Sequence, residues 1–354
     1  MPEIILDLEE LTLNPEEARS SSEMIIREFE QLPEIRDLHD IQTGIERETF
    51  IPIVGEISEE LGQCLEGLGC NVPEEEASIV FSQKKWHPKS IGTRLKHCMK
   101  TTNPLFKVFK KKLNHLESWD GTGSEEVAFI EERVLQALKK MVLRYSQWGD
   151  TDITVDDLTA GLDVSKFNCI DGVWKQIFQG VTAGKITRVE IAENAGATYN
   201  AQNTLDEQRA WKVMRDLYNK SNPAILEMPG VAFFMTRSMF NNWVDFRESK
   251  GFDVCCEGPE KALSSVRQYR GIPIKVINYW DTSIKKFFNN GTKLNLPNRV
   301  ILSATSNMPI GTEDENSLSN LDSFYWKKDK ANYVDIAFSL DTNVLLEDLI
   351  SVAY

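Results

Sequence analysis

The clearest hydrophobic pattern in the chain lies between residues 122 and 150, where apolar side chains recur at steps of three and four. This spacing predicts an amphipathic helix. Thr122 and Glu125 have the spacing of a capping box at its start, and Gly149 supplies a stop. At 1.5 Å per residue the helix is about 40 Å long, enough to serve as a spine for two domains. Its apolar face consists of Val127, Ile130, Val134, Leu138, Met141 and Tyr145.

Beyond Asp150 the pattern changes to shorter apolar runs that alternate with helical segments. Thr204 and Glu207 form a second capping box, and Thr236 is placed to cap a further helix. The helix behind the second box has an apolar stripe of Ala210, Val213, Met214, Leu217 and Tyr218. Strands that alternate with helices predict an α+β fold with a mixed sheet. We expect strands at 231–235, 272–278, 299–304, 333–340 and 344–352, with the last two returning to the long helix.

The segment 77–100 alternates polar and apolar residues on both sides of a turn region at 86–89. This predicts a two-stranded ribbon with little apolar face. Such a ribbon is marginally stable alone, so we expect it to lie on another surface. Upstream, we expect an extended arm in the first fifty residues, with a helix near 15–32, and a short helix between turns within 51–73.

Size and composition indicate an ordinary globular protein. With 354 residues the chain exceeds one simple core, which favours two connected domains. No run approaches the roughly 20 apolar residues that cross a bilayer, and residues 1–13 carry acids where a signal peptide carries lysines. We therefore expect a cytoplasmic protein without a membrane partner. Its six scattered cysteines favour reduced thiols.

The charge is distributed unevenly along the chain. The net charge of -14 argues against a protein devoted to binding phosphates. Residues 1–76 hold 21 acids against four arginines, whereas 83–115 hold nine lysines and Arg94 without an acid. Such opposite fields steer association, so we expect pairing between copies of the chain. The expected contact residues are Lys84, Lys85, Trp86, Lys89, Arg94, Lys96, Lys110, Lys111 and Lys112.

No pattern of catalytic, metal-binding or cofactor-binding residues emerges. The stretch from Gly180 to Lys185 has three residues between its glycines and Ile186 after the lysine, so it predicts a tight turn instead of a phosphate-binding loop. The four histidines never occur at i, i+4. Acidic clusters such as 152–157 lack the spacing of a calcium loop. We expect no enzyme and no cofactor.

The tryptophans of the second half indicate core or interface anchors. Stacking on nucleic acid would require basic residues between them, which the local sequence lacks. The residues concerned are Trp174, Trp211, Trp243 and Trp280.

Five local phrases, in order, resemble the major capsid proteins of tailed phages, of the Hong Kong 97 fold family. They lie at 85–98, 145–151, 169–177, 269–274 and 299–312. The resemblance covers residues from about 75 to 354 and implies an α+β subunit in five parts. These are an N-terminal arm with the start of a peripheral domain (1–76), an extended β-hairpin loop (77–120), the spine helix of the peripheral domain (121–163), an axial domain (164–311) and return strands of the peripheral domain (312–354).

The family's function follows as an expectation. Members assemble by heterologous contacts into pentamers and hexamers of an icosahedral shell around double-stranded DNA. The resemblance implies a separate scaffolding protein, a portal, non-specific DNA contact on the inner face, and residence in the virion after assembly in the host cytoplasm. It does not lead us to expect a covalent cross-link between subunits.

Three alternatives remain open at this point. They are an encapsulin-like nanocompartment shell, a soluble α+β enzyme with an unrecognised pocket, and a sheet-based nucleic-acid module that uses the basic ribbon. The shell interpretation requires that the basic ribbon lie on an adjoining copy and not in its own core or around a cavity.

Overall fold

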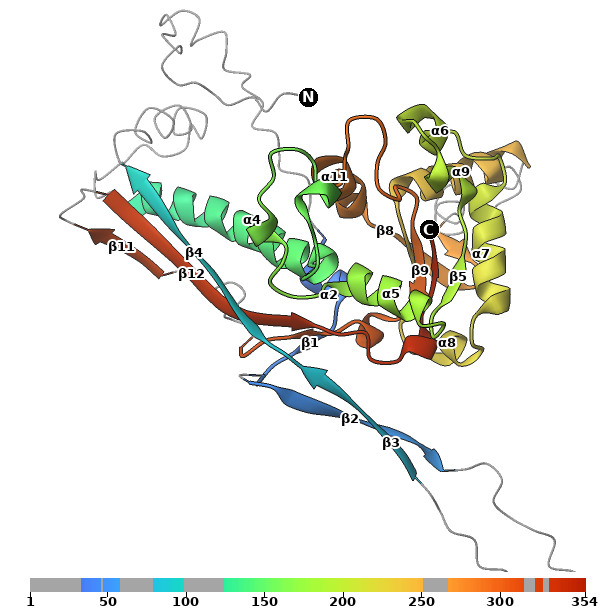
Figure 1. Cartoon of the computed structure of the whole chain (residues 1–354), viewed down its shortest axis with the longest axis horizontal. Helices are drawn as coiled ribbons and strands as arrows, with labels where there is room; N and C mark the ends of the chain where they lie inside the picture. Colours follow the sequence, from blue (N-terminus) through green and yellow to red (C-terminus); the bar gives the residue numbers. More distant parts are fainter. Residues whose placement is uncertain are drawn as a thin grey trace, which may run out of the picture. The chain divides into compact units, whose positions relative to one another are not determined.

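The computed structural model describes residues 33–45, 47–57, 79–98, 124–250, 267–314, 322–326 and 331–354 (Figure 1). The chain divides into two compact units. The smaller comprises 1–32, 94–134 and 322–334, and the larger comprises 33–93, 135–321 and 335–354. The six-stranded sheet and the site described below belong to the larger unit.

The larger unit is built on a six-stranded mixed sheet, in the order β5-β13-β9-β6-β8-β7. All residues of β6 and β9 are buried, because both strands are continuous apolar runs in the middle of the sheet. The strands are β5 (Thr187–Val189), β6 (Ala232–Met235), β7 (Gln268–Tyr269), β8 (Ile272–Val276), β9 (Val300–Ser303) and β13 (Ser351–Ala353).

Helices α5 (Val173–Thr182), α7 (Arg209–Lys220), α9 (Arg237–Ser249) and α11 (Asn278–Phe287) accompany this sheet, with the short helices α6 (Tyr199–Asn203) and α8 (Ala224–Glu227). The predicted apolar stripe of α7 is confirmed, since it packs into one core cluster with β6, β8 and β9. The predicted capping box is wrong. Helix α7 begins at Arg209, and the Thr204 hydroxyl instead donates to the carbonyl of Asn200, at the end of α6.

The long helix α4 (Ser124–Trp148) is confirmed, and Gly149 follows its last residue. A Cβ on Gly149 would lie 2.4 Å from the Ile170 carbonyl oxygen and 2.6 Å from that of Tyr145, so the close approach of 170–172 requires glycine. The expected Thr122 cap lies outside the described residues.

The apolar face of α4 is partly tested. Val134, Leu138 and Tyr145 are buried and Met141 is half-buried, whereas the side chains of Val127 and Ile130 lie outside the described part. Val142 and Leu143, off the predicted stripe, are also fully buried. The end of the helix is therefore enclosed on more than one side.

A second sheet contains β1 (Ile41–Gln42), β10 (Ile310–Gly311), β12 (Ala331–Thr342) and β11 (Asp322–Trp326) in that order, with β4 (Lys89–Cys98) also paired to β12. Separately, β2 (Thr49–Ile57) and β3 (Ile79–Trp86) form an antiparallel hairpin that runs away from the helices of its unit (Figure 1).

This pairing corrects the predicted ribbon. Strands β3 and β4 follow each other through His87 and Pro88 without reversing, so each pairs with a different strand (Figure 1). The segment 51–73, for which a short helix between turns is expected, begins in β2, where β-branched and aromatic residues form strand, and its remaining residues lie outside the described part. Residues 58–78 and the arm at 1–32 lie outside the described residues.

The end of the chain also differs from expectation. Of the predicted strand 344–352 only Ser351 and Val352 are in a strand, β13 (Ser351–Ala353), which pairs with β5 and β9 instead of returning to the long helix. The expected α+β class is confirmed, whereas the five domain boundaries stay a prediction. None of the helices in the described ranges is long and apolar enough to cross a membrane.

Candidate functional site

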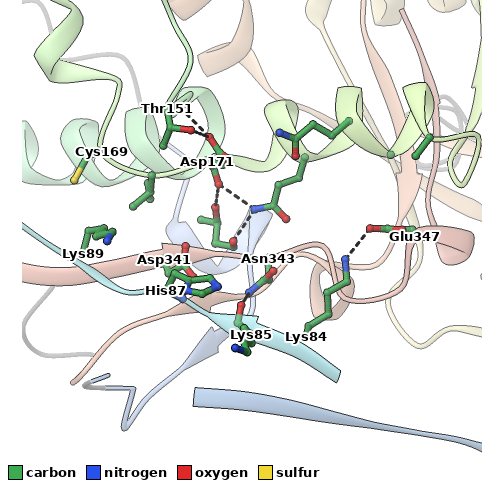
Figure 2. Close-up of a pocket in the computed structure, with 16 residues that line it drawn as sticks. Lys84, Lys85, His87, Lys89, Thr151, Cys169, Asp171, Asp341, Asn343 and Glu347 are labelled. Carbon is green, nitrogen blue, oxygen red and sulfur yellow. Dashed lines mark hydrogen bonds and ion pairs between the residues drawn. The ribbon is translucent and has the colours of Figure 1, made fainter. Parts of the chain in front are cut away.

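A polar hollow of about 390 Å³ lies where β3 leaves the hairpin and continues into β4 (Figure 2). Its walls come from Lys84–Lys89, from α5 and the loop before it, and from the end of β12 with the segment that follows. These segments are far apart in the sequence, so the hollow depends on the tertiary fold. We call this hollow with its walls the base of the hairpin.

Two lysines converge on one carboxylate at this base. Lys84 Nζ lies 2.7 Å from Glu347 Oε1, and Lys185 Nζ lies 2.9 Å from Glu347 Oε2. Burial raises the pKa of Glu347, but hydrogen bonds from the two lysines outweigh it, and the pKa falls below its ordinary value. Glu347 is therefore ionised at neutral pH and holds β3 against the turn that follows α5.

The backbone of the β3–β4 link is held by two further side chains. The His87 amide donates to Asp341 Oδ2 at 2.7 Å, and Asn343 Nδ2 donates to the Lys85 carbonyl at 3.0 Å. Burial raises the pKa of Asp341, and the amides of His87 and Thr342 oppose that rise. Figure 2 shows Asp341 just above His87 and Asn343 just above Lys85 in this view.

Gln176 of α5 closes the opposite wall. Its Nε2 donates to the carbonyls of Asp171 and Thr342, at 2.9 and 2.6 Å, and its Oε1 accepts from the amide of Val344 at 2.9 Å. The Thr342 hydroxyl also donates to the Asp171 carbonyl. One glutamine thus satisfies three backbone groups of two separate segments.

Trp86 anchors the end of β3 in the body of the larger unit. The side chain is 2% exposed. A Cβ on Gly311 would lie 2.8 Å from its ring and 2.9 Å from Ile45 Cδ1, so Gly311 permits this packing. The buried indole fixes the point from which the hairpin extends.

The other predicted contact residues are more exposed. Lys85 Nζ lies 4.7 Å from the ring centre of Phe50, and Lys96 Nζ lies 5.7 Å from that of Tyr333. Lys89 and Arg94 are exposed on β4. Lys110, Lys111 and Lys112 lie outside the described residues.

The expectation that these positions contact an adjoining copy stays a prediction, but Lys84 and Trp86 also make contacts within their own chain. Sequence reasoning missed their partners. Glu347, Asp341, Asn343 and Gln176 follow no local motif, and only the folded chain brings them to the hollow.

The thiol of Cys169 is not an activated nucleophile. Cys169 lines the hollow, but burial raises the pKa of its thiol, with a smaller opposing effect from Lys89, so it is protonated at neutral pH. Across the described ranges no three metal-ligating side chains gather into a site. The predicted tight turn is confirmed at Gly184, with φ +73°, and its neighbour Lys185 binds Glu347. We call the polar contacts of Lys84, Gln176, Asp341, Asn343 and Glu347 around the hollow the clamp.

The fold resembles solved phage structures. The capsid of Myoviridae phage XM1 is 10% identical, with 100% of this chain and 99% of that chain covered and a TM-score of 0.52. The chain has the fold of a phage capsid subunit. For Mycobacterium phage Ogopogo the identity is 10%, the coverage 92% of each chain and the TM-score 0.49. For the capsid of an empty GTA particle these are 10%, 96% and 98%, and 0.48.

No protein-family model and no curated protein matches the sequence. The resemblance to tailed-phage capsid proteins expected from the sequence is confirmed at the level of this capsid fold. The naming of the arm, the extended loop, the spine and the two domains stays a prediction.

Proposed function

We propose that this chain is a major capsid protein, a non-enzymatic subunit that assembles by heterologous contacts into pentamers and hexamers of an icosahedral shell around phage double-stranded DNA. One observation carries the proposal: the capsid fold of phage XM1 matches this chain from end to end, covering 100% of it and 99% of the phage chain.

The charge argument supports the proposal less than the sequence led us to expect. The basic segment does not form a free ribbon, because Lys84 and Trp86 are held by their own chain and Lys84, Lys85 and Lys89 line the hollow. The basic segment thus differs from the expected ribbon, whereas its contact with a neighbouring copy stays a prediction. The shell hypothesis now depends on the fold and on the hairpin β2–β3.

The hairpin has the physical properties of an assembly element. Within the described part of the chain its two strands pair with each other and with no further strand, and Phe50 is 53% exposed. A two-stranded ribbon is marginally stable in water, so it gains stability by lying on a further surface. A clamped base with unpaired outer edges suits heterologous contact with a neighbouring copy. Scaffolding protein, portal and packaged DNA are the further partners we propose, with the virion as destination and the host cytoplasm before assembly.

Particle size tests the proposal. We expect the purified protein to form pentamers, hexamers or shells in analytical ultracentrifugation and electron microscopy. Phe50→Ser should reduce assembly because it removes exposed apolar surface from the hairpin. Val155→Ser is the matched control, since Val155 is 65% exposed but lies in a turn outside the hairpin. A wild-type chain that stays monomeric to tetrameric, also with scaffold present, would contradict the capsid function.

A further inference from the structure

The turn between β7 and β8 places Arg270 in a backbone conformation that is unfavourable for arginine. Tyr269 pairs with Ile272, so Arg270 and Gly271 alone connect the two strands. Their φ angles are +50° and +83°. Such a turn favours Asn-Gly, because a residue with a Cβ is crowded in the left-handed region. Strained residues cluster at functional sites, so the Arg270 side chain is a candidate for binding.

The Arg270 guanidinium is exposed, but contacts with α7 hold it in place. Its central carbon lies 4.7 Å from the ring centre of Tyr218 and 5.6 Å from that of Tyr269. Nη1 also donates to Asn219 Oδ1 at 3.4 Å. No carboxylate within the described ranges adds an ion pair to these contacts. The rings contact the cation through their faces and leave the N–H groups at its edge open to an acceptor.

Arg270 extends a row of alternating rings and cations on α7. Trp211, Arg215 and Tyr218 follow one another at steps of four and three residues, so they share one face of the helix, and all three are half-buried. The central carbon of Arg215 lies 4.8 Å from the ring centre of Trp211. This contact corrects the expectation that the tryptophans of this half lack basic neighbours. Trp, Tyr and Arg are the residues that carry most of the binding energy at protein interfaces.

The charges favour an acidic protein surface as the partner of this row. Arg215 Nη2 lies 2.9 Å from Asp216 Oδ1, so Arg215 already has a carboxylate in its own chain. The chain holds 54 acidic residues against 40 basic ones, so a second copy carries an excess of carboxylates that attract Arg270. Nucleic acid fits less well. The two arginines occupy ring faces on which bases would stack, and the net charge of -14 repels phosphates.

We propose that Arg270 is an interface residue that binds a carboxylate of a second copy of this chain, with Tyr218 and Trp211 as the apolar surface beside it. The inference rests on the proposed shell function, because it names one surface through which neighbouring subunits bind. An arginine fork donates to both oxygens of a carboxylate. The rings hold the fork in position, so less side-chain freedom is lost on binding. Contact with the second copy then offsets the strain of the turn.

Arg270→Asn separates assembly from folding, because asparagine suits the turn but removes the cation. The melting temperature of the unassembled subunit should stay unchanged or rise by about 2 °C. The protein concentration needed for assembly should rise about tenfold, measured by light scattering and electron microscopy. Arg267→Asn is the matched control, since Arg267 is an exposed arginine beside the same hairpin, and it should change that concentration less than about twofold.

The two variants also distinguish this inference from the shell function. A wild-type chain that never assembles would end both. Assembly of Arg270→Asn at the wild-type concentration would overturn the interface role alone. A lower melting temperature of Arg270→Asn together with weaker assembly would overturn it as well, because Arg270 would then act through the fold.

Arg270→Lys identifies the partner by cross-linking. A carbodiimide joins an amine to a carboxylate that it contacts, taking up the water released. One part of ¹⁵N-labelled Arg270→Lys is assembled with excess unlabelled wild type, cross-linked, digested and analysed by mass spectrometry. We expect the labelled peptide that contains position 270 to be joined to an unlabelled peptide through Asp or Glu. A cross-link to a labelled peptide alone would place the carboxylate in the same chain, and cross-links at other lysines but none at position 270 would also overturn the proposal.

Discussion

The six-stranded sheet and the base of the hairpin are held together by different forces. In β6 and β9 every residue is buried, and most side chains are hydrocarbon. At the base of the hairpin Lys84, Asp341, Gln176 and Glu347 join segments through hydrogen bonds and ion pairs. Apolar burial contributes in proportion to area, whereas each polar contact adds little net stability but fixes direction. The sheet supplies stability, and the clamp determines where the hairpin emerges.

Removing a large side chain from the core of the sheet should have the largest effect on the free energy of unfolding. Phe233 in β6 is fully buried, and its ring lies 5.9 Å from that of Tyr269. Phe233→Ala should reduce the free energy of unfolding by about 3–5 kcal/mol, because it removes buried area and leaves a cavity. Urea unfolding of the unassembled subunit measures this. Phe50→Ala is the control, since that ring is 53% exposed and its loss should cost under about 0.5 kcal/mol.

A buried series of hydrogen bonds through His39, Gln147 and Trp280 offers a second contrast with the apolar sheet core. His39 Nδ1 lies 2.9 Å from the Met308 carbonyl, and His39 Nε2 lies 2.7 Å from Gln147 Nε2. Gln147 Oε1 accepts from Trp280 Nε1 at 3.0 Å. The only consistent arrangement is a neutral histidine with its proton on Nδ1, because Nε2 must accept from the glutamine. The segment that precedes β1 is thereby tied to α4 and α11.

The buried, neutral His39 should make the free energy of unfolding depend on pH. Burial lowers the pKa of His39 from 6.5 to about 4, and the bond to Met308 opposes the shift only partly. The unfolded chain therefore takes up the proton first, and stability is lost as the pH falls from about 6.5 to about 4. The loss is about 3 kcal/mol at its largest. His39→Gln should lose less between pH 7 and pH 4 in urea unfolding, and an identical profile would contradict the assignment.

The same contrast explains how far the sequence could predict the molecule. The described part of the α4 face, the stripe of α7 and the strands β6, β8 and β9 were predicted because each depends on a period or an apolar run within one segment. The partner of β3 was not, because alternation predicts a strand but does not select its neighbour. Likewise, the Thr204–Glu207 spacing matched a capping box, but tertiary contacts end α6 there and start α7 later.

The clamp could not be predicted from the sequence, for a related reason. Lys84 and Glu347 are 263 residues apart, and no sequence motif links them. A basic run reads as a charged surface until its acidic partner is known. The packing of Arg299 against Trp148 and Trp174 could not be predicted for the same reason. The two tryptophans lie on different helices, and the arginine lies just before a strand.

Loosening the clamp should have the smallest effect on overall stability. Glu347→Gln should reduce the free energy of unfolding by less than about 1 kcal/mol, because both ion pairs are partly solvated. Amide hydrogen exchange in β3 should nevertheless speed up, since the strand loses an anchor while the sheet keeps its core. Lys84→Met should speed exchange more than Lys185→Met, as the Lys84 side chain is 31% exposed and that of Lys185 64%. Equal exchange in all three variants and wild type would show that Trp86 alone fixes the hairpin.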